Sequence, residues 1–203
     1  MASDAKGGRE MNKKSWMIGL FSAMVLAQLG APIWMIAQSE WTLRTGRLFR
    51  FHTAPVDPYD AFRGRFVALR IEPNTAPAPP GISLEPNQKV YVRLTEDDRG
   101  FARIESLSIE RPTDDAYLEA TVMNPYGIPV ALRFPFDRYY LQENLAPKAE
   151  KAYQEHSSRG VRDAYITVRV QAGIAEIEGL YIGDRRIDDF LRNPDESSKT
   201  IEK

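Results

Sequence analysis

The feature that most constrains this chain is a long stretch without a charged side chain. Ser15–Ser39 contains no Asp, Glu, Lys, Arg or His. As an α-helix, its apolar centre Trp16–Ala37 would be about 33 Å long, which is enough to cross the roughly 30 Å hydrocarbon core of a bilayer. The apolar run is also longer than that of a cleaved signal peptide. We therefore expect a retained transmembrane anchor at 15–39 and one domain at 41–190, on a single side of the membrane.

The charges that flank the anchor predict its direction. Four basic residues precede it and three follow it, and the positive-inside rule keeps the more basic short flank in the cytoplasm. We expect a cytoplasmic tail at 1–14, an exported domain at 41–190 and a disordered polar tail at 191–203. The basic residues are Lys6, Arg9, Lys13 and Lys14 before the anchor, and Arg44, Arg47 and Arg50 after it.

Composition excludes several kinds of site. The formal net charge is -1 with acids and bases interspersed, which is not the pattern of a nucleic-acid-binding protein. The absence of cysteine excludes disulfides, thiolate metal sites and a cysteine nucleophile. His52 and His156 are far apart in the sequence, which predicts packing roles and no metal site. No glycine-rich phosphate loop or other cofactor motif is present, so we expect no cofactor.

Beyond the anchor the hydrophobic pattern alternates, which is typical of half-buried strands. We expect a mainly β domain of antiparallel strands with one helix near 145–158, capped by Asn144 and ended by Gly160. Leu145, Ala149, Ala152, Tyr153 and His156 would share the inner face of this helix. The expected strands are Arg47–Phe51, Phe66–Ile71, Lys89–Leu94, Phe101–Ile109, Tyr117–Met123, Val130–Phe134, Ala164–Val170 and Ile174–Ile182.

Two of the expected hairpins share a sequence. Gly100–Ile109 and Gly173–Ile182 are identical at six of ten positions, and Val-Ala-Leu-Arg stands upstream of each, at Val67–Arg70 and Val130–Arg133. We interpret this shared order as a duplicated β unit, with the helix inserted in the second copy. Chance similarity between β-rich sequences is the alternative. The first strands of the two hairpins are aligned as Val92–Leu94 with Val168–Val170.

The segment Asp57–Ile71 resembles the hallmark of the GDYXXLXY family. Gly64 and Leu69 match the family octapeptide and Phe66 replaces a tyrosine, whereas Arg65 stands where the family has aspartate. The resemblance implies a single-pass bacterial envelope protein. Together with the orientation that the flanking charges predict, this gives an inner-membrane anchor with the N-terminus inside and a periplasmic domain. Proteins of this family accompany multi-pass membrane proteins, so the expected partners are the lipid bilayer and such a protein. The family supplies no catalytic residues.

Candidate binding residues lie in the hallmark and near a second group, Arg138-Tyr139-Tyr140. In an extended chain Arg63 and Arg65 point to the same side, where they could hold an anion or a carboxylate. A structural corner, in which Asp57 or Asp60 holds an arginine, is the alternative. The candidate binding residues are Asp57, Arg63, Gly64, Arg65, Arg138, Tyr140 and Glu143.

We expect a non-catalytic accessory or binding subunit of a multi-pass membrane partner. Gln28, Gly30 and Pro32, in the middle of the anchor, mark a place where a partner helix could dock. One alternative is a membrane-surface hydrolase, based on Ser39 with Lys89 or on two of the carboxylates of Asp57, Asp60, Glu119 and Glu143. Another alternative is an envelope sensor or binding domain for a small or glycan ligand.

Overall fold

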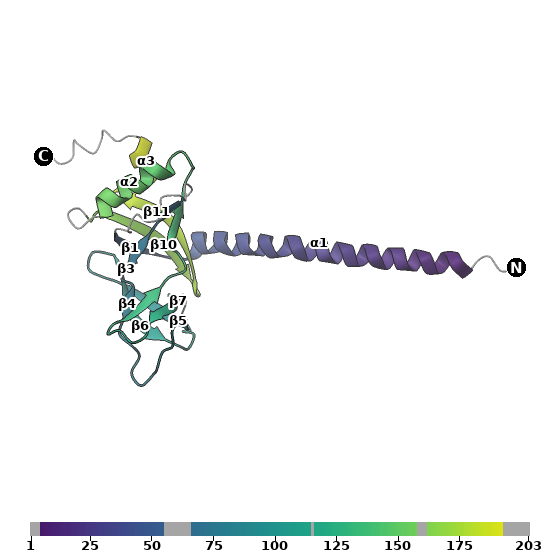
Figure 1. Cartoon of the computed structure of the whole chain (residues 1–203), viewed down its shortest axis with the longest axis horizontal. Coiled ribbons are helices and arrows are strands. Elements are labelled where there is room, and N and C mark those ends of the chain that lie inside the picture. Colours follow the sequence, from purple (N-terminus) through teal and green to yellow (C-terminus); the bar gives the residue numbers. More distant parts are fainter. Residues whose placement is uncertain (1–4, 55–65, 115, 158–161, 193–203) are drawn as a thin grey trace. The chain divides into compact units, whose positions relative to one another are not determined.

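The computed structural model describes residues 5–54, 66–114, 116–157 and 162–192. The chain divides into two compact units, Met1–Trp41 and Thr42–Lys203. Helix α1 (Ala5–Thr45) contains the charge-free stretch, and from Lys13 to Thr45 it is long and apolar enough to cross a membrane (Figure 1). Large apolar side chains are exposed along this span, from Trp16 to Trp41.

The second unit is mainly β, as the alternating pattern predicts, and its named strands pair antiparallel. One sheet has the order β12-β11-β10-β1-β3, a second has the order β4-β8-β7-β5-β6, and β2 pairs with β9. The strands are β1 (Arg47–Ala54), β2 (Phe66–Ala68), β3 (Arg70–Glu72), β4 (Thr75–Ala76), β5 (Lys89–Glu96), β6 (Ala102–Ser108), β7 (Tyr117–Asn124), β8 (Val130–Arg133), β9 (Arg138–Tyr140), β10 (Ala164–Gln171), β11 (Ile174–Ile182) and β12 (Arg185–Arg186).

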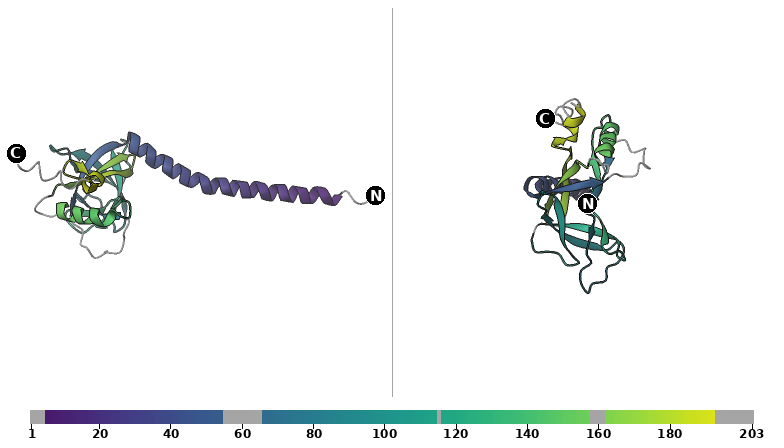
Figure 2. Two further views of the ribbon diagram at one scale, coloured as in Figure 1. Left: turned by 90° about the horizontal axis from the view of Figure 1, so that it is seen from above. Right: turned by 90° about the vertical axis from the view of Figure 1, so that its left-hand side faces the viewer.

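Helix α2 (Ala146–Ser157) confirms the helix predicted near 145–158. The sequence pattern did not predict the short helix α3 (Ile187–Arg192). Helices α2 and α3 lie together at one end of the β domain (Figure 2). Ala149, Ala152 and Tyr153 are buried as expected. Leu145 and His156 are only half-buried, because the buried face turns toward Ser157 at the helix end.

The strand predicted at Phe66–Ile71 is divided at Leu69. Its first part, β2, pairs with β9, and its second part, β3, pairs with β1 on the other side. Between them the Leu69 amide donates to the Asp137 carbonyl at 2.8 Å. The segment therefore changes its partner strand at Leu69, which lies between the two paired stretches.

The core is built from alternating residues of both sheets. Phe49 and Phe51 of β1 are buried, and so are Ile166 and Val168 of the paired strand β10. Each such side chain stabilises the fold by roughly 1.5–3 kcal/mol relative to an exposed position. The inward-facing residues of the second sheet join the same buried cluster, so the two sheets share one core.

The register of the two hairpins supports the duplicated β unit. In the hairpin β5–β6 the pairing shifts by one residue and leaves Glu105 as a bulge. In the hairpin β10–β11 the same shift leaves Glu178 as a bulge. These glutamates are aligned in the sequence repeat. We therefore define repeat 1 as β1–β6 and repeat 2 as β7–β11.

The same register continues through the neighbouring strands. The bulges make β5 equivalent to β10, and the strands that pair with these two on the far side, β7 and β1, are therefore equivalent as well. In this register Ala54 of β1 corresponds to Thr121 of β7. Ala54 pairs with Arg70 and Thr121 pairs with Arg133, the last residues of the two Val-Ala-Leu-Arg segments. The equivalence extends to single hydrogen bonds. The bond from the Leu69 amide to the Asp137 carbonyl has a counterpart of the same length, 2.8 Å, from the Leu132 amide to the Asn74 carbonyl.

The bulges also correct one alignment made from the sequence. Val92 was expected to be equivalent to Val168, but the shift in pairing makes Leu94 the equivalent of Val168. The expected alignment was two residues out of register. A shift of two preserves the alternation of inward and outward side chains, which is why the pattern alone could not exclude it.

The two repeats exchange strands. In the sheet that contains β1, strand β1 of repeat 1 pairs with β10 of repeat 2. In the other sheet, β7 and β8 of repeat 2 pair with β5 and β4 of repeat 1, respectively. We call β1, β2, β3, β9, β10 and β11 the first half of the domain and β4–β8 the second half. Each half therefore needs both repeats.

Candidate functional site

Four of the candidate residues, Asp57, Arg63, Gly64 and Arg65, lie outside the described residues. The other three follow one another along the chain. Arg138 and Tyr140 belong to β9, and Glu143 lies in the turn before α2. The strand β9 pairs with β2, which begins at Phe66, directly after the arginines of the hallmark.

Arg138 and Tyr140 meet around the ring of Phe66. The rings of Phe66 and Tyr140 contact edge to face with their centroids 5.7 Å apart. The Arg138 guanidinium carbon lies 5.0 Å from the Phe66 ring centroid, and its Nε lies 3.5 Å from Oδ1 of Asp137. Tyr140 keeps 67% of its surface exposed. We call Phe66, Asp137, Arg138 and Tyr140 the β9 corner.

The internal duplication shows which parts of the β9 corner the fold itself requires. The strand β4 is the equivalent of β9, and it pairs with β8 as β9 pairs with β2. The residues equivalent to Phe66, Arg138 and Tyr140 are Pro129, Thr75 and Pro77. The same backbone is therefore built without a cation or aromatic rings, so the side chains of the β9 corner are free to serve another purpose.

A groove runs beside the β9 corner. It has a volume of about 470 Å³ and is lined by Pro135–Tyr140 on one side and Ala175–Ile177 of β11 on the other. Glu176 faces it from β11, so its lining carries both charge signs as well as aromatic and aliphatic surface. Such a mixed lining suits a peptide better than a small ion.

Helix α2 joins β1, which precedes the hallmark segment, to β3, which contains the end of that segment. The Tyr153 hydroxyl donates to the Ala54 carbonyl at 2.8 Å and accepts from the Arg70 amide at 3.4 Å. Ala54 and Arg70 pair across β1 and β3, so one phenol closes the base of the segment between them. Burial raises the pKa of Tyr153, against the hydrogen bond from the Arg70 amide, and the phenol stays a neutral donor.

This contact was missed by sequence reasoning, which expected Tyr153 only as a core residue of the helix. The available signal was its chemical type. A tyrosine on an apolar helix face carries a hydroxyl that needs a hydrogen-bond partner when it is buried. Its partners are far away in the sequence, so they could not be named from it.

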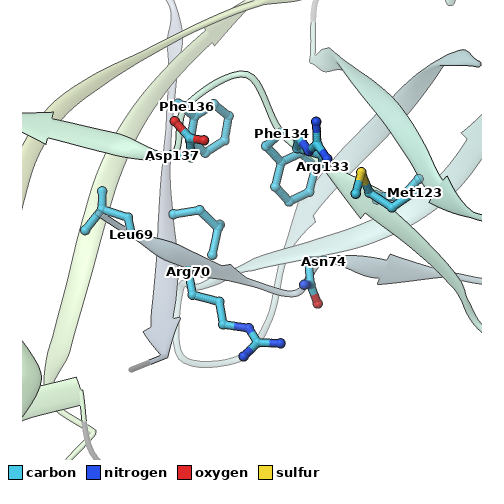
Figure 3. Close-up of a pocket in the computed structure, with 10 residues that line it drawn as sticks. Leu69, Arg70, Asn74, Met123, Arg133, Phe134, Phe136 and Asp137 are labelled. Atoms are coloured by element: carbon cyan, nitrogen blue, oxygen red, sulfur yellow. The ribbon is translucent and has the colours of Figure 1, made fainter. Parts of the chain in front are cut away.

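A second cavity, of about 190 Å³, lies where the two Val-Ala-Leu-Arg segments meet (Figure 3). Its lining contains equivalent residues from both repeats. The cavity is therefore a consequence of the duplicated backbone, and it is not a feature added to one repeat. In Figure 3 Arg70 lies in the lower part of the view and Arg133 lies beside Phe134 in the upper part, so the two arginines do not converge on one point. The equivalent pairs in the lining are Leu69 with Leu132, Arg70 with Arg133, Ile71 with Phe134, and Asn74 with Asp137.

Other candidate groups have local partners. His52 stacks on Phe101 with the ring centroids 3.7 Å apart, and His156 Nδ1 lies 2.8 Å from Oδ1 of Asp163. Lys89, proposed as a base, is 82% exposed and lies 3.5 Å from Glu119. Within the described parts of the chain, no three His, Asp or Glu side chains come close enough to hold a metal ion.

Comparison with known proteins agrees with the resemblance seen in the hallmark. No curated protein and no solved structure matches the chain. The family model described as GDYXXLXY protein matches residues 28–180, from the middle of α1 into β11. The match covers most of the chain and includes both repeats, the β9 corner and α2. The chain belongs to the GDYXXLXY family.

Proposed function

We propose that this protein is a non-catalytic, membrane-anchored subunit that binds a multi-pass membrane protein. In this proposal α1 crosses the bacterial inner membrane with the N-terminus in the cytoplasm. The β domain then lies on the periplasmic side, where the β9 corner is available to a partner. The membrane-spanning length of α1 and the family membership support the proposal.

The observation that carries the proposal is a group of polar atoms in the middle of the span. Pro32 lies inside α1 and has no N–H, so the carbonyl of Gln28 lacks its helical donor. The Gln28 side chain adds an amide at the same level, and both residues are exposed. Unpaired polar groups cost several kcal/mol each in hydrocarbon. A polar group on a neighbouring transmembrane helix would remove this cost, which a multi-pass partner can provide.

The test is recovery of the complex from native membranes. Full-length protein is crosslinked, solubilised in detergent and purified, and we expect a multi-pass membrane protein in stoichiometric amount. The double variant Gln28→Leu, Pro32→Leu should lose at least tenfold of this partner, whereas Ile33→Leu, one position further, should retain it. Recovery of the wild-type protein alone contradicts the proposal.

The orientation has a separate test. A reporter that is active only outside the cytoplasm, fused to the C-terminus, is expected to be active. Activity of a matched cytoplasmic reporter at the same position would contradict a periplasmic β domain.

A further inference from the structure

The outer edge of β9 presents backbone groups that β2 does not use. The Leu69 amide bonds to the Asp137 carbonyl, and hydrogen-bonded pairs alternate along an antiparallel ladder. The next bonded pair is therefore Val67 with Tyr139. It follows that the N–H and C=O groups of Arg138 and Tyr140 point away from β2. Among the described residues, no strand pairs with this edge of β9.

The facing strand across the groove is also open along its edge. One side of β11 pairs with β10 along its whole length, but the other side pairs with β12 only at Tyr181 and Ile182. Ala175–Ile177 therefore line the groove from a stretch of β11 that β12 does not cover. The groove of about 470 Å³ is bordered by two strand edges, as well as by side chains.

The second half of the domain shows how the same edge can be closed. The position equivalent to Tyr140 is Pro77, which has no N–H to donate, and Pro79 and Pro80 follow it. Proline on an edge strand is a common protection against the addition of another strand. The duplicated backbone thus carries a blocked edge at β4 and a competent edge at β9.

We propose that the edge of β9 accepts an extended segment of the multi-pass membrane partner as an added β-strand, an inference that rests on the proposed function. Main-chain bonds to Arg138 and Tyr140 supply the pairing. The exposed guanidinium of Arg138 fits a carboxylate of the segment, and the rings of Phe66 and Tyr140 fit an apolar residue next to it. Because Asp137 and Glu176 also line the groove, the partner segment is extended and carries basic as well as acidic residues beside the apolar one.

The first test locates the segment. A photo-crosslinking residue replaces Glu176, which lines the groove, in the full-length protein in native membranes. We expect crosslinks that map to a non-helical segment of a multi-pass membrane protein. The matched control places the crosslinker at Arg103, the equivalent position of repeat 1, and should give no such product. Crosslinks that map to this chain itself overturn the proposal.

The second test separates the backbone from the side chain. With the crosslinker at position 176, Tyr140→Pro removes the outward N–H and should lower the yield at least tenfold. Tyr140→Ala keeps the N–H and should lower it much less. Both variants lose the ring contact with Phe66, and Pro77 occupies the equivalent place, so Tyr140→Pro should unfold at the same midpoint as Tyr140→Ala.

The outcomes distinguish this inference from the proposed function. A yield equal to wild type with Tyr140→Pro overturns the added strand. If capture still depends on Gln28 and Pro32 in that case, the membrane-subunit proposal stands. Both proposals are supported if Tyr140→Pro loses the crosslink while it unfolds at the same midpoint as Tyr140→Ala, and if Gln28→Leu, Pro32→Leu still lowers partner recovery.

Discussion

The two halves of the β domain are built on one plan but carry different surfaces. They share strand order, the bulges at Glu105 and Glu178 and the amide bonds of Leu69 and Leu132. They differ where the first half has the hallmark segment, helix α2 and the β9 corner. The shared features show what the backbone needs in order to fold. The features found in one half only are not required by that plan, and α2 contacts both β1, before the hallmark segment, and β3, at its end.

This proximity connects the two departures from the repeat. The hallmark segment extends the connection between β1 and β2 in repeat 1, and α2 extends the connection between β9 and β10 in repeat 2. Tyr153 of α2 bonds to Ala54, before the hallmark segment, and to Arg70, near the end of that segment. Two additions made in different repeats therefore serve the same corner of the molecule.

The largest expected effect tests whether the halves are interlocked. Phe51 and Leu118 are equivalent and fully buried. Phe51→Ala should lower the free energy of unfolding by about 3–5 kcal/mol and Leu118→Ala by about 2–5 kcal/mol, because each leaves a cavity. Urea unfolding of the full-length protein in detergent, followed by circular dichroism, should show one transition for both variants. Two separate transitions would mean that the halves fold independently.

The next effect concerns the contact that exists only in the first half. Tyr153→Phe removes the hydroxyl and leaves the buried Ala54 carbonyl and the Arg70 amide without this partner, at a cost of about 1–3 kcal/mol. Hydrogen exchange at the Arg70 amide should become faster. The control Tyr126→Phe lies in the turn between β7 and β8, is 86% exposed and should change neither quantity. Unchanged exchange at Arg70 would remove the role given to Tyr153.

A smaller difference separates the two hairpin glycines. Gly100 and Gly173 have φ values of 77° and 94°, so an alanine at either position is strained by about 1–2 kcal/mol. A Cβ at Gly173 would also lie 3.2 Å from a ring carbon of Tyr117, whereas at Gly100 it would meet nothing within 4 Å. Gly173→Ala should therefore be the more destabilising change in urea unfolding. Equal costs would show that the ring of Tyr117 moves aside freely.

The smallest expected effect depends on pH. Burial lowers the pKa of His52, and the charges of Asp97 and Glu72 offset this only in part, with Arg162 and Arg99 acting in the same direction as burial. The unfolded chain then binds a proton more tightly than the folded chain. The associated stability is present above about pH 6.5 and is lost as the pH falls through the folded pKa.

Unfolding midpoints measured between pH 7 and pH 5 should decline less in His52→Phe, which keeps a ring against Phe101, than in wild type. The equivalent residue of the other half is Glu119, so the effect belongs to one half only. An identical decline in the variant would assign the pH dependence to other groups.

Most of the strands and α2 could be predicted from the sequence because their signals are local. The glycine of each hairpin turn, the alternating residues and the bulged glutamate lie within ten residues of one another. The division at Leu69 could not be predicted, since it depends on β9, a strand of three residues far along the chain. Short strands have too few alternating positions to give a pattern.

The candidate site was predictable to a similar degree. Arg138 and Tyr140 were found because a cation and aromatic side chains are adjacent in the sequence. Their position beside Phe66, and the open edge beneath them, depend on pairing between distant strands. The contrast with Pro77 becomes visible only once the register of the two repeats is known.

The exchange of strands between the repeats also determines the order in which the domain can form during synthesis. Phe51 pairs with Ile166, which is made long after it, so β1 must wait for β10 before its sheet exists. Such long-range pairing makes folding slow and leaves apolar strands exposed in the meantime. A chain that ended after β6 would hold two unfinished sheets, and a second copy of the same fragment could complete both of them.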